Sequence, residues 1–255
     1  DDLITFSTMT YQWQWNLDEI KRKSMVADNV LQFIGRRIVT LPQPVQRLLQ
    51  LAAHLGYRFD EDLLAKVLRS EFVRGSKDVT NHENQIHELL EYGLQENFIE
   101  QIEGTENTFR YKFVHVQVQA ACQKLFEHNA TKKSIEQLHW NIGAALWRGW
   151  RGNNTYEFVP NRVIFPCVKE INLGLAGFIL RQGTRYQVIQ LNHEAAKRSY
   201  AINAYFPAAS YLECAVRQLT LSDWDDNYDL TLELHTALAQ MNLASGQLSP
   251  IPGVV

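Results

Sequence analysis

The sequence lacks the features on which several classes of function depend. None of its 13 glycines lies in a Gly-x-x-x-x-Gly-Lys-Ser/Thr loop, the loop that holds the phosphates of a nucleotide. Its eight histidines do not show the paired spacing of a metal site. We therefore expect no enzyme activity, no catalytic residue, no metal and no cofactor in this segment itself.

Charge of one sign is not in excess, and long apolar runs are missing. The 28 acidic and 25 basic residues give a net charge of -3, without the basic excess expected of a nucleic-acid-binding protein. No apolar run approaches the roughly 20 residues of a membrane-spanning helix. We therefore predict neither nucleic acid nor a membrane among the partners.

Cysteine is scarce, and its pattern argues against disulfides. The three cysteines, Cys122, Cys167 and Cys214, are far apart, and each lies in an apolar helical stripe. The start of a helix can lower a thiol's pKa, so a nucleophilic Cys122 is one interpretation. Packing is favoured, because Cys122 shares its stripe with Val118 and other apolar residues. Core thiols indicate a reducing, cytoplasmic location.

Length and hydrophobic periodicity predict a mainly α protein. A chain of 255 residues with 45% hydrophobic residues buries roughly three quarters of its unfolded surface, enough for one large core or two modest ones. We divide it into an N-terminal aromatic arm with a short helix (1–27), a winged-helix domain with a small β-hairpin (28–127) and a tetratricopeptide-like helical-repeat domain (128–255).

The clearest pattern lies between residues 85 and 125. A helix from Gln85 is followed by two alternating runs, Phe98–Glu103 and Thr108–His115, which residues 104–107 join as a tight reversal. A second helix starts at once, with the stripe Val118, Ala121, Cys122, Leu125 and Phe126. Helix, hairpin and helix in this order are typical of a winged helix-turn-helix domain.

His115 is the one histidine with a suggestive position. Alternation puts it on the same face as Phe109, Tyr111 and Phe113, so we expect its imidazole at the inner end of an aromatic ladder. It also falls at the junction between the predicted strand and the next helix. A helix-capping histidine and a core histidine are the alternatives to a functional one.

The segments before this unit predict an arm and four helices. In the arm, Tyr11, Trp13 and Trp15 alternate as in a strand, and the two tryptophans serve either packing or a partner. A short helix covers Leu17–Lys23. The further predicted features are a helix with the stripe Val30, Phe33, Ile34 and Ile38, a helix from Pro44 to Gly56, a helix capped by Asp60, and a polar loop Arg69–Glu83.

The segments after it predict helical hairpins. Apolar periodicity marks the helices Ser134–Arg148, Asn161–Leu173, Thr184–Asn203, Tyr205–Leu219 and Asp225–Leu243. Their starts are about 20 residues apart, a spacing compatible with tetratricopeptide-like pairs.

The order of motifs resembles one family over nearly the whole chain. The similar segment follows the nucleotide-binding core of STAND-type (AAA-like) signalling ATPases in multidomain hybrid sensor histidine kinases, some with serine/threonine-kinase-like N-terminal domains. Its motifs here include Trp13-Gln14-Trp15-Asn16-Leu17, Leu41-Pro42, Tyr111-Lys112-Phe113, His115, His139 with Ile142-Gly143, Asn172 with Gly174, Leu191-Asn192, Tyr211-Leu212, and Trp224 with Tyr228.

The resemblance implies a regulatory and coupling segment that is cut from a longer protein and has no catalysis of its own. Its partner would be the neighbouring nucleotide-binding domain of the same polypeptide, which would bind ATP or ADP with Mg²⁺. His115 would contact the nucleotide phosphates in that parent. The family's Asp and Arg after the histidine are replaced by Val116 and Gln117, and its His-Leu before Asn172 by Glu170-Ile171.

Two other functions fit the same patterns. The chain is alternatively a scaffold whose helical repeats bind a protein partner, or the equivalent segment of an ATP-dependent transcription activator. DNA binding by the winged unit is disfavoured, because the helix from Asp60 to Arg69 offers little positive charge besides Lys66 and Arg69.

Overall fold

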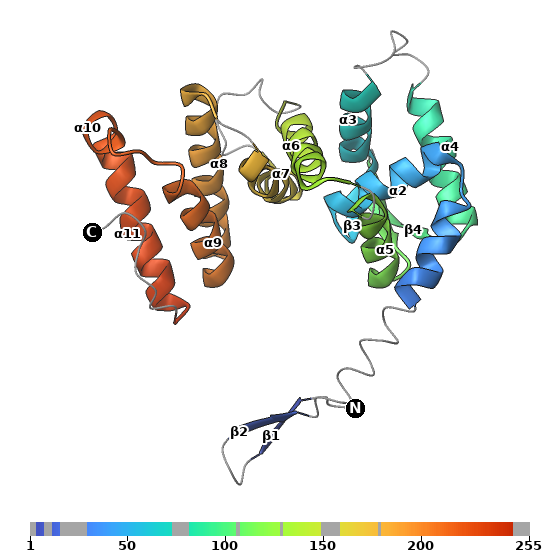
Figure 1. Cartoon of the computed structure of the whole chain (residues 1–255), viewed down its shortest axis with the longest axis horizontal. Helices are drawn as coiled ribbons and strands as arrows, with labels where there is room; N and C mark the ends of the chain where they lie inside the picture. The colour runs from blue at the N-terminus through green and yellow to red at the C-terminus, as the bar shows by residue number, and fades with distance from the viewer. Residues whose placement is uncertain are drawn as a thin grey trace. The chain divides into compact units, whose positions relative to one another are not determined.

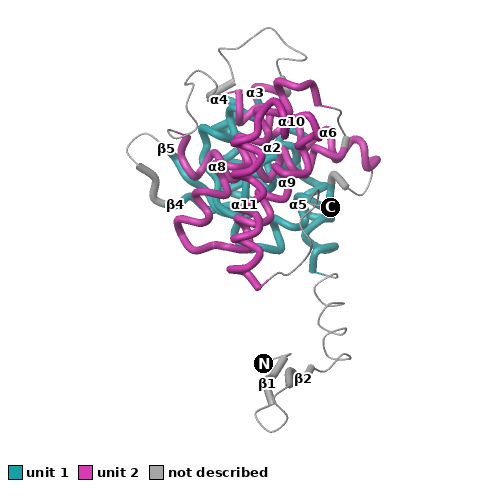
Figure 2. Tube along the Cα trace, turned by 90° about the vertical axis from the view of Figure 1, so that its left-hand side faces the viewer, with its two compact units in different colours: residues 1–68, 75–129 teal, residues 69–74, 130–255 magenta. Residues whose placement is uncertain are grey.

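The computed structural model describes residues 4–7, 12–15, 30–72, 82–105, 108–127, 130–148, 159–177 and 180–246. These residues are mainly helical, which confirms the expected fold class at that level. The chain divides into two compact units (Figure 2). Unit 1 comprises residues 1–68 and 75–129, and unit 2 comprises residues 69–74 and 130–255.

The helices of unit 1 pack around α2 (Gln43–Leu55). Pro44 lies in its first turn, where a missing amide hydrogen is harmless, and Gly56 ends the helix with φ of 147°. Both features were predicted. The helices α4 (His82–Gln95) and α5 (Val116–Glu127) pack against α2. Two α5 side chains, Gln119 and Gln123, donate hydrogen bonds to the Ala53 carbonyl of α2.

A three-stranded antiparallel sheet completes unit 1. Its order is β3 (Arg58–Asp60), β5 (Thr108–Phe113) and β4 (Ile99–Thr105). The sequence predicted the β4–β5 hairpin but missed β3. In β3, Phe59 pairs with Tyr111 of β5 and stacks on its ring at 5.8 Å.

Several expectations for unit 1 need correction. Asp60 was expected only as the cap of the helix that now begins at Glu61, but it also ends β3 and accepts a hydrogen bond of 2.8 Å from Arg110 Nε of β5. In the helix over residues 30–39, Phe33 is 70% exposed, so only part of the predicted stripe is buried. The predicted loop Arg69–Glu83 is shorter, because α3 (Glu61–Phe72) extends into it and α4 begins at His82.

The N-terminal arm contains two strands. β1 (Ile4–Ser7) pairs antiparallel with β2 (Gln12–Trp15), which places Trp13 opposite Phe6. The alternation of tryptophans predicted β2, whereas β1 was not predicted. The short helix expected at 17–23 lies outside the described residues.

Unit 2 is a series of helices that pack on their neighbours in sequence (Figure 1). α6 (Lys132–Arg148) packs on α7 (Asn161–Gly174), which continues into the short 3₁₀ helix η2 (Leu175–Gly177). α7 packs on α8 (Gln182–Ala201), α8 on α9 (Tyr205–Val216), and α9 on α11 (Tyr228–Ala244).

The last predicted helix, Asp225–Leu243, is two helices in the structure. α10 (Asp223–Asp226) is a single turn, and Asn227 with φ of -145° separates it from α11. The apolar periodicity continues across Asn227, so it could not reveal the break.

Small residues let the helices of unit 2 approach closely. A Cβ on Gly143 of α6 would lie 2.6 Å from the Ile171 side chain of α7, and one on Gly174 would lie 2.6 Å from the Trp140 backbone nitrogen. Between α8 and α9, buried alanines serve the same purpose, among them Ala196, Ala208 and Ala209. Within the described residues, no helix combines the length and apolar character that crossing a membrane requires.

Candidate functional site

His115 lies in the short connection between β5 and α5, and its side chain is exposed. β5 ends at Phe113, two residues before it, because the chain turns at that point into the helix that begins at Val116. The predicted junction between strand and helix is therefore present. The histidine belongs to the junction rather than to the strand.

The expected aromatic ladder ending in His115 is wrong. Tyr111 and Phe113 are buried, but Phe109 is 54% exposed and His115 is exposed as well. Alternation correctly predicted that Tyr111 and Phe113 of β5, which lies between β3 and β4, share a buried face. It failed beyond Phe113, where the extended conformation stops. Because His115 is exposed, the core-histidine interpretation is also wrong.

The hydrogen bonds of His115 show what its side chain does in this structure. Its carbonyl accepts from the amides of Val118 (3.0 Å) and Gln119 (3.4 Å), and its Nδ1 accepts from the amide of Gln117 at 3.2 Å. His115 is thus the N-terminal cap of α5, in agreement with the capping interpretation. A neutral imidazole that accepts at Nδ1 carries its proton on Nε2. The exposed ring therefore has one further donor, at Nε2, besides the acceptor that caps the helix.

The residues around His115 are apolar or uncharged. Val116 is 58% exposed, and Gln117 follows it. The first turn of α5 contains no acidic residue.

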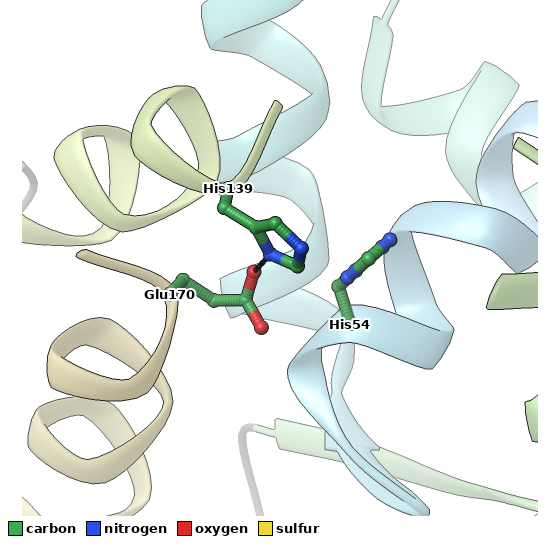
Figure 3. Close-up of side chains that lie close together, drawn as sticks. All are labelled: His54, His139 and Glu170. Atoms are coloured by element: carbon green, nitrogen blue, oxygen red, sulfur yellow. Dashed lines mark hydrogen bonds and ion pairs between the residues drawn. The ribbon is translucent and has the colours of Figure 1, made fainter. Parts of the chain in front are cut away.

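A buried histidine–carboxylate pair in unit 2 was not found by sequence reasoning. His139 Nδ1 of α6 lies 2.6 Å from Glu170 Oε2 of α7, as Figure 3 shows, and Glu170 is fully buried. The Lys169 ammonium lies 3.2 Å from the other carboxylate oxygen. The pair ties α6 to α7. The sequence feature that could have indicated this pair is Glu170, an acidic residue three positions after Cys167 in an apolar helical stripe.

Two asparagines named by the resemblance meet between α7 and α8. Asn172 Nδ2 donates to Asn192 Oδ1 at 2.7 Å, and Asn192 Nδ2 donates back to Asn172 Oδ1 at 3.0 Å. Asn192 is fully buried. A reciprocal amide pair satisfies both side chains only in one register, so it fixes how α7 and α8 slide on each other.

The thiols are packing residues, as the favoured interpretation predicted. Cys122 and Cys167 are buried, and Cys214 is half-buried. Burial raises the pKa of Cys122 to about 12 and raises the pKa of Cys167 as well. The thiols stay protonated at neutral pH, so Cys122 is not an activated nucleophile.

Comparison with known proteins gives one informative similarity. No family model matches the chain, and no solved structure matches it. The chain is 25% identical over 287 residues to Hybrid signal transduction histidine kinase G of Dictyostelium discoideum. The match covers 96% of this chain and 8% of that protein, so the chain spans less than a tenth of its relative. The chain is therefore similar to a small part of a hybrid histidine kinase.

Proposed function

We propose that the chain is a regulatory and coupling segment of a STAND-type signalling ATPase within a sensor histidine kinase, without catalysis of its own. The observation that carries this proposal is the similarity to a hybrid histidine kinase along 96% of the chain. The division into a winged-helix domain and a helical-repeat domain belongs to the proposal, and so does a cytoplasmic location.

Unit 1 supports the proposal through its arrangement of elements. Helices α2, α3 and α4 are followed by the β4–β5 hairpin, with β3 inserted before α3 and paired to β5. A winged-helix domain has helices and a small antiparallel sheet in this order, and we assign unit 1 to that class. Nucleic acid is not part of the proposal, because α3 carries only Lys66 and Arg69 as cations and Lys66 lies 3.7 Å from Asp62.

Unit 2 supports the proposal as a series of helices that pack on one another. Each helix packs on the next, and glycines and alanines occupy the close contacts. Tetratricopeptide-like repeats are built in this way, so we assign unit 2 to helical repeats of that kind.

The nucleotide belongs to the parent protein in this proposal. The chain has no phosphate-binding loop, and we propose that the neighbouring nucleotide-binding domain of the same polypeptide holds ATP or ADP with Mg²⁺. His115 would then donate a hydrogen bond from Nε2 to a nucleotide phosphate. Its exposure and its Nδ1 contact with Gln117 support that role.

The proposal is tested by comparing the chain alone with the protein that contains it. Calorimetry on the isolated chain should detect neither ATP nor ADP binding at micromolar concentrations, and phosphate release should be absent. In the parent, deleting this segment should speed ADP release and raise basal kinase activity. Unchanged ADP release after the deletion would contradict a coupling role.

A protein-interaction scaffold is the second candidate, favoured by a specific observation. Unit 2 exposes large apolar side chains on several helices, including Leu173, Tyr200, Phe206, Leu232 and Leu243. Such a surface suits a protein partner on the helical repeats. The equivalent segment of an ATP-dependent transcription activator stays an alternative, and the domain that follows the segment in the parent decides between them.

A further inference from the structure

α11 has two apolar faces, and only one of them is packed within the described residues. The packed face contains Leu234, Leu238 and Met241, which are buried in the core shared with α8 and α9. A second stripe consists of Tyr228 (55% exposed), Leu232 (43%) and Leu243 (72%). At 3.6 residues per turn these three positions lie within roughly 60° of one another around the helix. We call them the outer stripe.

Aromatic packing extends the outer stripe beyond the start of α11. The rings of Trp224 in α10 and Tyr228 are 6.0 Å apart, and Trp224 stacks on His235 at 5.3 Å. Tyr228 thus packs against a half-buried neighbour, while more than half of its own surface is exposed. The stripe is a supported surface rather than a set of isolated side chains.

The same end of unit 2 is acidic. Residues 218–246 contain five acidic residues and neither lysine nor arginine. Two of the acids have partners: Asp223 binds Arg185, and Glu233 lies 3.3 Å from His193 Nε2.

The remaining three carboxylates form a rim beside the outer stripe. Asp225, Asp226 and Asp229 are exposed, and none of them forms an ion pair with the part of the chain that the structure describes. Asp229 lies in the first turn of α11, where a negative charge suits the helix dipole. Asp225 and Asp226 lie before that helix, so the dipole of α11 does not account for them. We call the three the acidic rim.

We propose that the outer stripe and the acidic rim together bind a basic amphipathic helix of another protein segment. Such a helix would lay its apolar side on Tyr228, Leu232 and Leu243 and direct Lys or Arg toward the rim. From Tyr228 to Leu243 the stripe is about 22 Å long, which matches a helix of about 15 residues. A second copy of this chain fits poorly, because residues 218–246 of that copy would bring no lysine or arginine to pair with the rim. The inference deepens the scaffold alternative and does not depend on nucleotide binding by the parent.

The test uses the full chain and a pair of designed peptides. A fluorescein-labelled amphipathic helix of about 18 residues carries leucines on one side and lysines on its flanks. Its twin has glutamates in place of the lysines. Fluorescence anisotropy should show that the lysine peptide binds and that the glutamate twin does not. The affinity for the lysine peptide should be several-fold weaker in about 0.5 M salt than in about 0.05 M salt.

Matched variants locate the binding on α11. Leu232→Glu should lower the affinity for the lysine peptide by about tenfold or more. Leu173→Glu, the same change at an exposed position of α7, should leave the affinity unchanged. Asp225→Asn with Asp226→Asn should weaken binding and reduce its salt dependence. Both leucines are exposed, so circular dichroism melting should show that each variant remains folded.

Three results would overturn the proposal. They are equal effects of Leu232→Glu and Leu173→Glu, equal binding of the two peptides, and a dimer in sedimentation equilibrium that Leu232→Glu dissociates. The last result would make a second copy the occupant. None of them bears on ADP release in the parent, so failure here is distinguishable from failure of the coupling role.

Discussion

Asp223, the first residue of α10, is clamped by Arg185 of α8 through two contacts, Nη1–Oδ2 at 2.5 Å and Nη2–Oδ1 at 3.2 Å. The amide and hydroxyl of Thr220 donate to the same carboxylate at 2.7 and 2.8 Å. Asp223 is buried, and the Arg185 side chain is only 14% exposed. This pair therefore fixes the corner between α9 and α11.

We expect Asp223→Ala to destabilise the chain by about 3 to 5 kcal/mol, because it leaves the largely buried Arg185 charge without its carboxylate. Urea denaturation followed by circular dichroism measures the loss. Asp226→Ala is the matched control: its carboxylate is exposed, and its removal should cost less than about 0.5 kcal/mol. Equal effects of the two substitutions would show that the clamp adds no stability.

The clamp also predicts how stability depends on acid. The hydrogen bonds from Arg185 and Thr220 hold the pKa of Asp223 well below its usual range. A lowered pKa means that the unfolded chain binds the proton more readily than the folded one. The contribution of Asp223 is therefore complete above about pH 4 and is lost as the pH falls further. The stability difference between the wild type and Asp223→Asn should be constant from pH 5 to 7 and shrink below about pH 4.

Two histidines predict a second pH window. Burial lowers the pKa of His235 and of His193, and Lys197 adds to the effect at His193. Their contribution is complete above about pH 6.5 and declines as the pH falls below that value. His235→Phe, which keeps an aromatic ring against Trp224, should make melting temperature less dependent on pH between 5 and 6.5. An unchanged slope in His235→Phe would contradict this contribution of His235.

Close packing of α6 and α7 gives a steric prediction. A Cβ on Gly174 would lie 2.6 Å from the backbone nitrogen and 2.8 Å from the Cα of Trp140. Backbone atoms cannot rotate away, so Gly174→Ala should cost about 1 to 3 kcal/mol. Gly183 in the first turn of α8 has nothing within 4 Å of that position. Gly183→Ala should therefore be neutral or stabilise by up to about 1 kcal/mol, and equal melting temperatures for the two variants would contradict the packing.

Sequence periodicity predicted the long elements and missed the short ones. α2 and α8 begin and end within a few residues of the expected positions, because their apolar stripes run over several turns. β3 has three residues, too few to show alternation, and it exists because Phe59 packs on the sheet beside Tyr111. The division between α10 and α11 depends on the Asp223 clamp, which no local pattern encodes.

The sequence predicted where His115 lies along the chain, but it did not predict the surroundings of its side chain. Sequence order placed His115 between a strand and a helix, whereas its exposure depends on where β5 stops. The His139–Glu170 pair joins residues 31 positions apart, so only the packing of α6 on α7 brings them together. The resemblance named Asn172 and Asn192 separately, and the structure shows that their side chains hydrogen bond to each other.

The most informative prediction separates the two roles that His115 would have. In the isolated chain, His115→Ala removes the acceptor for the Gln117 amide at the start of α5. Loss of a helix cap costs about 1 kcal/mol, so the melting temperature should fall only slightly. In the parent protein, the same substitution should speed ADP release roughly tenfold, because one hydrogen bond to a charged phosphate contributes about 1.5 to 3 kcal/mol.

His115→Asn distinguishes capping from nucleotide contact. Asparagine is among the best N-cap residues, so this variant should restore the stability of the isolated chain. It lacks the Nε2 donor that projects beyond the cap, so ADP release from the parent should stay fast. Stopped-flow release of a fluorescent ADP analogue and thermal melting, applied to both variants, measure the two effects separately. Slow ADP release from both variants would leave His115 as a helix cap alone, and the nucleotide contact would have to come from another residue.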